Sequence, residues 1–211
     1  THDRVSNHIW LGGEFLYRGP NFGESWQKAS SMQMPDGGRV SAIAVSPHNN
    51  AVLIAGTDKG HIVRTGNATQ AIAGVAFGTS RPREGWVTSI AFDAKNPGVV
   101  YATYGNFGGT HVFRSLDNGE TWHSLDGAGP GSLPDIPVHS LVVDLDDAQR
   151  LYLGTDVGVI TSIDGGRTWM VEETGFGPAV TMWLHAIRTS SGQKLLFAFT
   201  HGRGVWRVAL R

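Results

Sequence analysis

Short apolar segments alternate with polar turns along the whole chain, and no stretch has the 3.6-residue period of an amphipathic helix. Four segments share one pattern of β-branched and small apolar residues, namely 40–45, 87–92, 138–143 and 184–187. They begin 46 to 51 residues apart. A period of this size, carried by strand-like segments, predicts a repeated supersecondary unit.

Each of these segments is followed by a polar turn and a second apolar segment. The second segments are 52–55, 99–103, 151–153 and 195–199. A glycine-rich turn, a third strand, a further turn and a fourth strand complete the period. Four antiparallel strands in roughly 40–50 residues are typical of one propeller blade. The predicted fold class is therefore all-β, a β-propeller with four-stranded antiparallel blades.

The turn between the third and fourth strands twice carries the motif Ser-x-Asp-x-Gly-x-Thr-Trp. Its residues are Ser115, Asp117, Gly119 and Trp122, and then Ser162, Asp164, Gly166 and Trp169. A looser copy occupies 18–26, while 64–67 keeps the period without the motif. In such a turn an aspartate accepts backbone N–H groups, a glycine adopts a positive φ, and a tryptophan buries its ring against a neighbouring sheet. The motif is therefore interpreted as structural.

The two ends of the chain match incomplete blades. Residues 9–26 resemble the second to fourth strands of a blade whose first strand is missing, and 184–210 resemble the first three strands of another. The chain then holds about four to five blades, and 1–211 is a single domain or a propeller fragment. Either an N-terminal strand completes the last blade of a small ring, or missing chain or a second copy completes a larger ring. The larger ring is favoured.

Composition narrows the classes of partner. The net charge of −1 over 211 residues gives no overall attraction to nucleic acid, and no apolar run is long enough for a membrane span. The absence of cysteine excludes disulfides and Cys-based metal sites. The chain starts at Thr1, which suggests processing or truncation, and an extracellular or periplasmic location is expected. No cofactor and no metal site are expected, because neither a His-x-x-x-His pair nor an acidic calcium loop occurs.

The motif resembles the Asp-box (BNR) repeat of sialidases, sortilin-type receptors, xyloglucan-degrading glycosidases and a photosystem assembly factor. The ending 200–207 is also similar to the last blade of bacterial sortilin-like and glycosidase-like propellers. In these families the Asp-box turn lies on the face away from the active site. The resemblance therefore places the working surface at the opposite ends of the strands, in the turns between second and third strands and in the blade connections.

Those turns and connections supply the candidate ligand-binding residues. They are Trp86, Asn106, Asp135, His201 and Arg203, a set of aromatic, amide, acidic and basic groups suited to a polyol. Asp58 and Asp156 lie in similar Gly-Thr-Asp-x-Gly turns; they are the catalytic candidates if the protein is a glycosidase, which needs two carboxyls. The alternative is that both aspartates only stabilise their own turns. Trp10 and Trp183 are expected to pack rather than to bind.

Three functional hypotheses remain open. The first is a module that binds a glycan or a protein ligand. The second is a glycoside hydrolase, or a fragment of one, that uses Asp58 and Asp156 as acid and base. The third is a scaffold in a larger assembly. A complete sialidase site is not expected, because the Arg-Ile-Pro signature of that family is absent.

Overall fold

The computed structural model describes residues 2–3, 7–30, 33–70, 75–173 and 175–210, and its strands form five antiparallel sheets. The first sheet contains β1 (His2–Asp3), β2 (His8–Gly12), β3 (Leu16–Gly19) and β4 (Gln27–Lys28). The second contains β5 (Val40–Val45), β6 (Leu53–Thr57), β7 (Ile62–Thr65) and β8 (Gly78–Ser80). The third contains β9 (Val87–Phe92), β10 (Val100–Tyr104), β11 (Val112–Ser115) and β12 (His123–Ser124).

The last two sheets follow the same order along the chain. The fourth contains β13 (Val138–Val143), β14 (Leu151–Thr155), β15 (Gly158–Ser162) and β16 (Met170–Val171). The fifth contains β17 (Thr181–Arg188), β18 (Lys194–Thr200) and β19 (Val205–Leu210). Two short 3-10 turns, η1 (Asn21–Gly23) and η2 (Pro35–Gly37), add helical character. In the described ranges no helix is long and apolar enough to cross a membrane.

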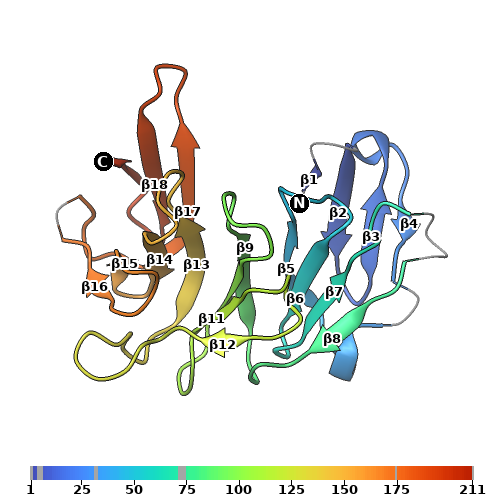
Figure 1. Cartoon of the computed structure of the whole chain (residues 1–211), viewed down its shortest axis with the longest axis horizontal. Coiled ribbons are helices and arrows are strands. Elements are labelled where there is room, and N and C mark those ends of the chain that lie inside the picture. Colours follow the sequence, from blue (N-terminus) through green and yellow to red (C-terminus); the bar gives the residue numbers. More distant parts are fainter. Residues whose placement is uncertain (1, 4–6, 31–32, 71–74, 174, 211) are drawn as a thin grey trace.

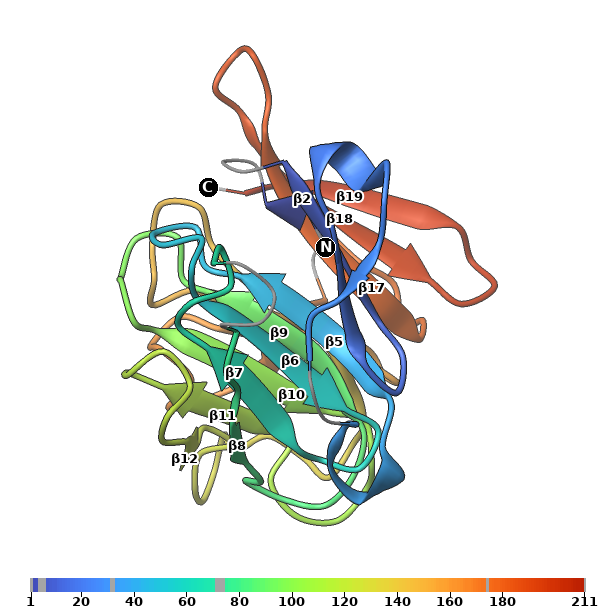
Figure 2. The same ribbon diagram turned by 90° about the vertical axis from the view of Figure 1, so that its right-hand side faces the viewer.

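The five sheets follow one another along an open arc (Figure 1). Neighbouring sheets contact each other through β2 and β5, β5 and β9, β9 and β13, and β13 and β17. Seen from the side of the first sheet, the second and third sheets lie one behind the other (Figure 2). The first and last sheets border the opening of the arc (Figure 1). This arrangement confirms the predicted all-β propeller fold with four-stranded antiparallel blades.

The strand predictions are confirmed with two differences. Segments 40–45, 87–92 and 138–143 are β5, β9 and β13, and the last sheet has the three strands expected of it. The expected strand at 184–187 is longer, because β17 starts at Thr181. The first blade does have a first strand: β1 pairs with β2 through His2 and Ile9 and through Asp3 and His8.

The core lies between successive sheets because alternate residues of the second strand of a sheet point to opposite faces. In β6, Leu53 and Ala55 join a cluster with residues of the first sheet, whereas Ile54 joins a cluster with the third sheet. In β14, Leu153 faces the third sheet and Tyr152 faces the fifth. Each central sheet therefore needs two neighbours to cover its apolar side chains.

A β-bulge recurs in the first strand of four sheets. The pairing register shifts by one residue near the start of β5, β9, β13 and β17. The residues left unpaired at these shifts are Ser41, Thr88, His139 and Met182. An extra residue in one strand re-aims its side chain. The same bulge thus positions one side chain from each of four sheets at the same end of the strands.

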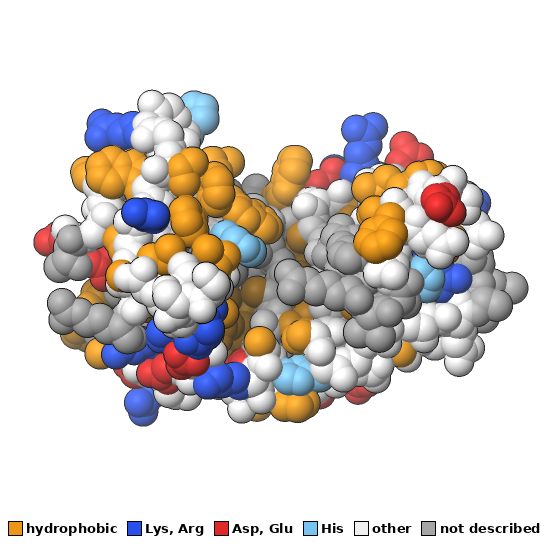
Figure 3. Space-filling view, turned by 90° about the horizontal axis from the view of Figure 1, so that it is seen from above, with side chains coloured by type: hydrophobic (Ala, Val, Ile, Leu, Met, Phe, Trp, Pro, Cys, Tyr) orange, Lys and Arg blue, Asp and Glu red, His pale blue; other side chains and the backbone are white. Residues whose placement is uncertain are grey.

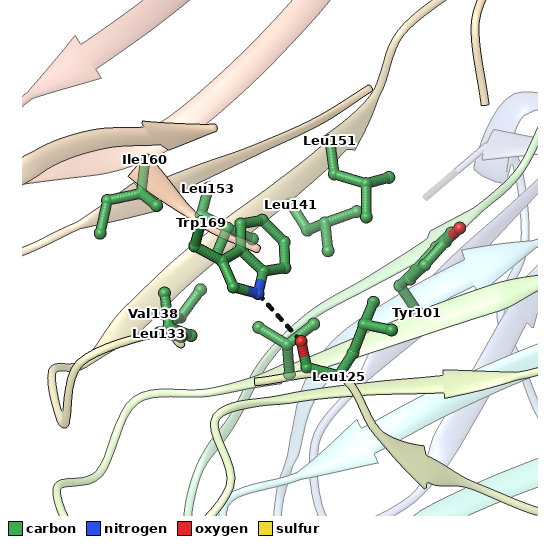
Figure 4. Packing of buried hydrophobic residues seen from close by; sticks show 10 residues of the cluster. Tyr101, Leu125, Leu133, Val138, Leu141, Leu151, Leu153, Ile160 and Trp169 are labelled. Atoms are coloured by element: carbon green, nitrogen blue, oxygen red, sulfur yellow. Dashed lines mark hydrogen bonds between the residues drawn. The ribbon is translucent and has the colours of Figure 1, made fainter. Parts of the chain in front are cut away.

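Trp169 shows how a motif residue joins two sheets. Its side chain is 6% exposed and packs with Leu125 and Leu133 of the preceding blade and with Leu151 of its own sheet (Figure 4). The indole Nε1–H donates a hydrogen bond of 2.9 Å to the backbone carbonyl of Leu125. The buried ring and its satisfied N–H fix the fourth sheet against the third.

Substitution of Trp169 by alanine is predicted to lower the free energy of unfolding by about 3–5 kcal/mol, because it leaves a large cavity between two sheets. Urea denaturation followed by circular dichroism measures the loss. Trp26→Ala is the matched control, since Trp26 occupies the corresponding place in the looser motif and is 44% exposed. Equal losses in the two variants would contradict this account of Trp169.

Candidate functional site

A pocket of about 410 Å³ lies where the third, fourth and fifth sheets meet. Its lining residues are Trp86, Thr88, Gly105, Asn106, His139, Met182 and Trp183. Three of them are bulge residues, so the repeated backbone irregularity helps to form the pocket. The volume falls within the range of pockets that bind small molecules.

Trp86 comes immediately before β9, and its side chain is 53% exposed. Its backbone N–H donates to Asn106 Oδ1, and its carbonyl accepts a 3.0 Å hydrogen bond from the N–H of Gly105. Gly85 has a φ of 127°, and a Cβ there would lie 2.6 Å from Asn106 Oδ1. Only glycine fits this close approach. The β10–β11 turn therefore fixes the backbone from which the exposed indole projects.

The bulge residues divide into two kinds. Ser41 Oγ and Thr88 Oγ1 each donate a 2.6 Å hydrogen bond to a carbonyl at the start of the next sheet, Val87 and Val138 respectively. His139 instead places Nε2 2.7 Å from Asp156 Oδ1, and Met182 is 47% exposed. Hydroxyls thus connect sheets in the first half of the arc, whereas an imidazole and a thioether line the pocket in the second half.

Trp183 is the pocket residue that the sequence prediction got wrong. It was expected to pack, but its side chain is 52% exposed and lines the pocket, whereas Trp10 is 1% exposed and packs as expected. Trp183 pairs with Phe199. The corresponding cross-strand pairs of the other sheets are Ala42 with Gly56, Ser89 with Thr103, and Ser140 with Gly154. This change from small to aromatic residues is the sequence signal that could have shown that Trp183 is not covered by a neighbouring sheet.

The structure brings together two of the five predicted ligand-binding residues, Trp86 and Asn106. Asp135 supports the same β10–β11 turn, since its Oδ1 accepts a 2.7 Å hydrogen bond from the N–H of Gly108 and lies 3.1 Å from His111 Nε2. His201 and Arg203 are exposed on the β18–β19 turn and do not line the pocket.

The two catalytic candidates lie on different sheets. Asp58, in the β6–β7 turn of the second sheet, accepts a 2.8 Å hydrogen bond from the backbone N–H of Arg39 through Oδ1. Asp156, in the β14–β15 turn of the fourth sheet, binds His139. The third sheet separates them along the arc, and no contact recorded between described residues joins the two carboxylates. Asp156 alone is connected to the pocket.

Lysine, arginine and carboxylate side chains are absent from the lining of this pocket. Two indoles and a methionine provide apolar surface, and the amide of Asn106 and the imidazole of His139 provide polar groups. An anionic ligand would find no Lys or Arg among these side chains. The lining therefore suits an uncharged ligand that has both apolar faces and hydroxyl groups.

The two Ser-x-Asp-x-Gly-x-Thr-Trp turns lie at the other end of the third strands. Ser115 Oγ donates 2.6 Å to Asp117 Oδ1 and accepts from the N–H of Gly119, while Asp117 accepts from the N–H groups of Glu120 and Thr121. Asn118 and Gly119 have φ values of 58° and 85°. The second copy repeats these bonds with Ser162 and Asp164. These motif residues close their own turns.

The hydrogen bonds of these turns lower the pKa values of both aspartates. Burial raises the pKa of Asp117, but bonds from Ser115, from the Thr121 hydroxyl and from backbone N–H groups outweigh it and lower the pKa to about 2. The Thr168 hydroxyl and N–H and the Ser162 hydroxyl lower the pKa of Asp164 to about 2. Both groups are carboxylates at neutral pH, and this charged form stabilises the turn.

No protein family matches the sequence, and no curated protein sequence matches it either. Solved structures do. An ancestral GH74 enzyme aligns over 96% of this chain and 29% of its own length, with 24% identity and a TM-score of 0.67. The Niastella koreensis GH74 enzyme aligns over 99% of this chain and 35% of its own, with 17% identity and a TM-score of 0.69.

A third similar structure is the β-propeller domain of Cps50 (Swd1) from Myceliophteria thermophila. It aligns over all of this chain and 64% of its own length, with 13% identity and a TM-score of 0.71. The chain thus spans about a third or less of the two GH74 enzymes and less than two thirds of this domain. At these identities the likeness establishes the propeller fold.

Asp164→Asn is predicted to make the free energy of unfolding less dependent on pH under acidic conditions. A carboxyl whose pKa is lowered on folding contributes stability above its unfolded pKa near 4, and this contribution is lost as the pH falls through about 2. The parent protein should therefore lose stability between pH 4 and pH 2 more steeply than the variant, which should already be less stable at pH 7. Urea midpoints across this pH range measure both effects. An unchanged pH slope in the variant would show that Asp164 does not act in this way.

Proposed function

We propose that this chain is an Asp-box propeller module that binds a glycan in the pocket between Trp86 and Trp183. The observation that carries the proposal is the pair of half-exposed indoles lining one pocket together with Asn106 and His139. Pyranose rings present C–H faces that pack on indole rings and hydroxyls that hydrogen-bond to amides and imidazoles. An extracellular or periplasmic location is part of the proposal.

The size and charge of the pocket favour a glycan over a protein ligand. A volume of about 410 Å³ accommodates one or two sugar units, whereas protein partners usually cover a broad and flatter surface. The absence of ionic side chains from the lining also suits a neutral sugar. Two of the similar structures are GH74 enzymes, that is, glycoside hydrolases by name, which supports a propeller of this kind as a carbohydrate-handling scaffold.

Trp86→Ala and Trp183→Ala are each predicted to weaken binding of xyloglucan oligosaccharides roughly 10-fold, since one aromatic contact contributes on the order of 1 kcal/mol. Isothermal titration calorimetry measures the affinities. Trp26→Ala removes an exposed indole of the first sheet, outside the pocket, and should leave the affinity unchanged. Full binding in both pocket variants would refute this site.

A glycoside hydrolase is the second candidate, and Asp156 favours it. Its carboxylate holds His139 at the edge of the pocket, whereas Asp58 lies on a different sheet. If Asp156 acts in hydrolysis, Asp156→Asn should lower release of reducing sugar from xyloglucan by about 10²-fold or more while binding persists. Asp58→Asn tests the predicted acid and base pair in the same assay. Binding of the substrate without any release by the folded parent chain would assign the pocket to a binding module.

A scaffold in a larger assembly is the third candidate, and the similar Cps50 (Swd1) structure shows only that the fold also occurs outside the GH74 enzymes. A scaffold requires a protein ligand rather than a sugar. The variants Trp86→Ala and Trp183→Ala distinguish a scaffold from a glycan-binding module, because a protein partner that covers a broad surface should tolerate the loss of one indole in this pocket.

A further inference from the structure

The two end sheets of the arc each leave one apolar face uncovered in the described structure. In the fifth sheet, Leu184 and Ala198 pack against the fourth sheet. Trp183, Phe199 and Val205 pair in register and therefore share the opposite face. Their side chains are 52%, 40% and 56% exposed. Hydrophobic side chains gather on this side of the molecule, where the arc opens (Figure 3).

The first sheet has the complementary arrangement. Trp10 and Leu16 are buried against the second sheet. Leu11 and Tyr17 are paired neighbours on the other face, and Leu11 is 50% exposed. Leu11 and Tyr17 thus mark the outer face of the first sheet. In each later sheet, the equivalent face packs against the sheet before it. Trp183, Phe199 and Val205 mark the outer face of the fifth sheet. In each earlier sheet, the equivalent face packs against the sheet after it.

We propose that a second copy of this chain covers these faces, so that the fifth sheet of one copy packs on the first sheet of the other. The contact would continue the sheet-to-sheet packing that already occurs four times within the chain, in the same direction. An interface between two different faces of identical chains is heterologous, and it produces either a closed ring or an open oligomer. The proposal concerns the surfaces at the opening of the arc and shares Trp183 with the pocket, but its tests by mass and cross-linking require no pocket ligand.

The shapes of the two faces also favour this pairing over contact between two fifth sheets. Within the chain, sheets approach so closely that a Cβ on Gly12 would lie 2.3 Å from Val40, and one on Gly56 would lie 2.2 Å from Val87. The fifth sheet has the bulky Phe199 at the position of Gly56. A contact between two fifth sheets would bring two such crowded faces together, whereas the first sheet presents Leu11 and Tyr17.

Cross-linking of the intact chain tests the pairing directly, because the sequence contains no cysteine. Leu11→Cys and Val205→Cys each introduce one thiol at an exposed position. Mixed together with a short thiol-reactive cross-linker, the two variants should form a covalent heterodimer through residues 11 and 205. Leu116→Cys is the control, since Leu116 is 60% exposed on a motif turn of the third sheet and should not cross-link to either.

Analytical ultracentrifugation of the parent chain should show a concentration-dependent mass above that of one copy. Phe199→Glu should weaken this association at least 10-fold, while Leu116→Glu should leave it unchanged; circular dichroism shows whether each variant is folded. A parent chain that stays a single copy at all concentrations overturns the proposal. Cross-links that form only between two copies of residue 205, or only between two copies of residue 11, also overturn it, because they indicate a symmetric contact.

Discussion

Coverage of each sheet by its neighbours is the constraint on which this structure depends. Short four-stranded sheets alternate their apolar side chains between two faces, so neither set is buried until a sheet lies on each side. Ile54 and Leu53 are adjacent in sequence yet belong to different interfaces. Stability is therefore distributed along the arc through pairwise contacts. The same constraint explains the exposed aromatic face at the end of the arc, since Trp183 and Phe199 lie where a covering sheet would pack.

The fold was predictable because the signals for it are local. Alternating apolar residues mark the strands. The Ser-x-Asp-x-Gly-x-Thr-Trp turns form these hydrogen bonds between residues of the motif itself, so they do not depend on contacts with distant parts of the chain. The first strand escaped prediction because the described pairs of β1 are made by His2 and Asp3, which form no apolar pattern. Trp183 escaped it because a tryptophan in a strand looks the same in sequence whether or not a neighbour covers it.

The site was predictable in part. Topology places the turns between second and third strands and the blade connections at one end of the blades; Asn106, predicted from such a turn, and Trp86, predicted from a blade connection, both line the pocket. It missed His139 and Met182 because a β-bulge redirects one residue and has no signature when Ser, Thr, His and Met all occupy it. The two aspartates show the limit of motif reasoning. Asp58 and Asp156 share one sequence pattern, but the first binds a backbone N–H and the second orients a pocket histidine.

The bulge explains how one repeated backbone position serves both the packing between sheets and the lining of the pocket. At this position Ser41 and Thr88 bind the next sheet, so replacing either would leave a carbonyl of the neighbouring strand without its hydroxyl donor. His139 and Met182 make no such bond among the described contacts and are therefore available to the pocket. Because the motif turns close the opposite end of the blades, the pocket end can change its side chains without disturbing the turns. Separation of the two ends of each strand therefore allows the lining of the pocket to vary while the fold is kept.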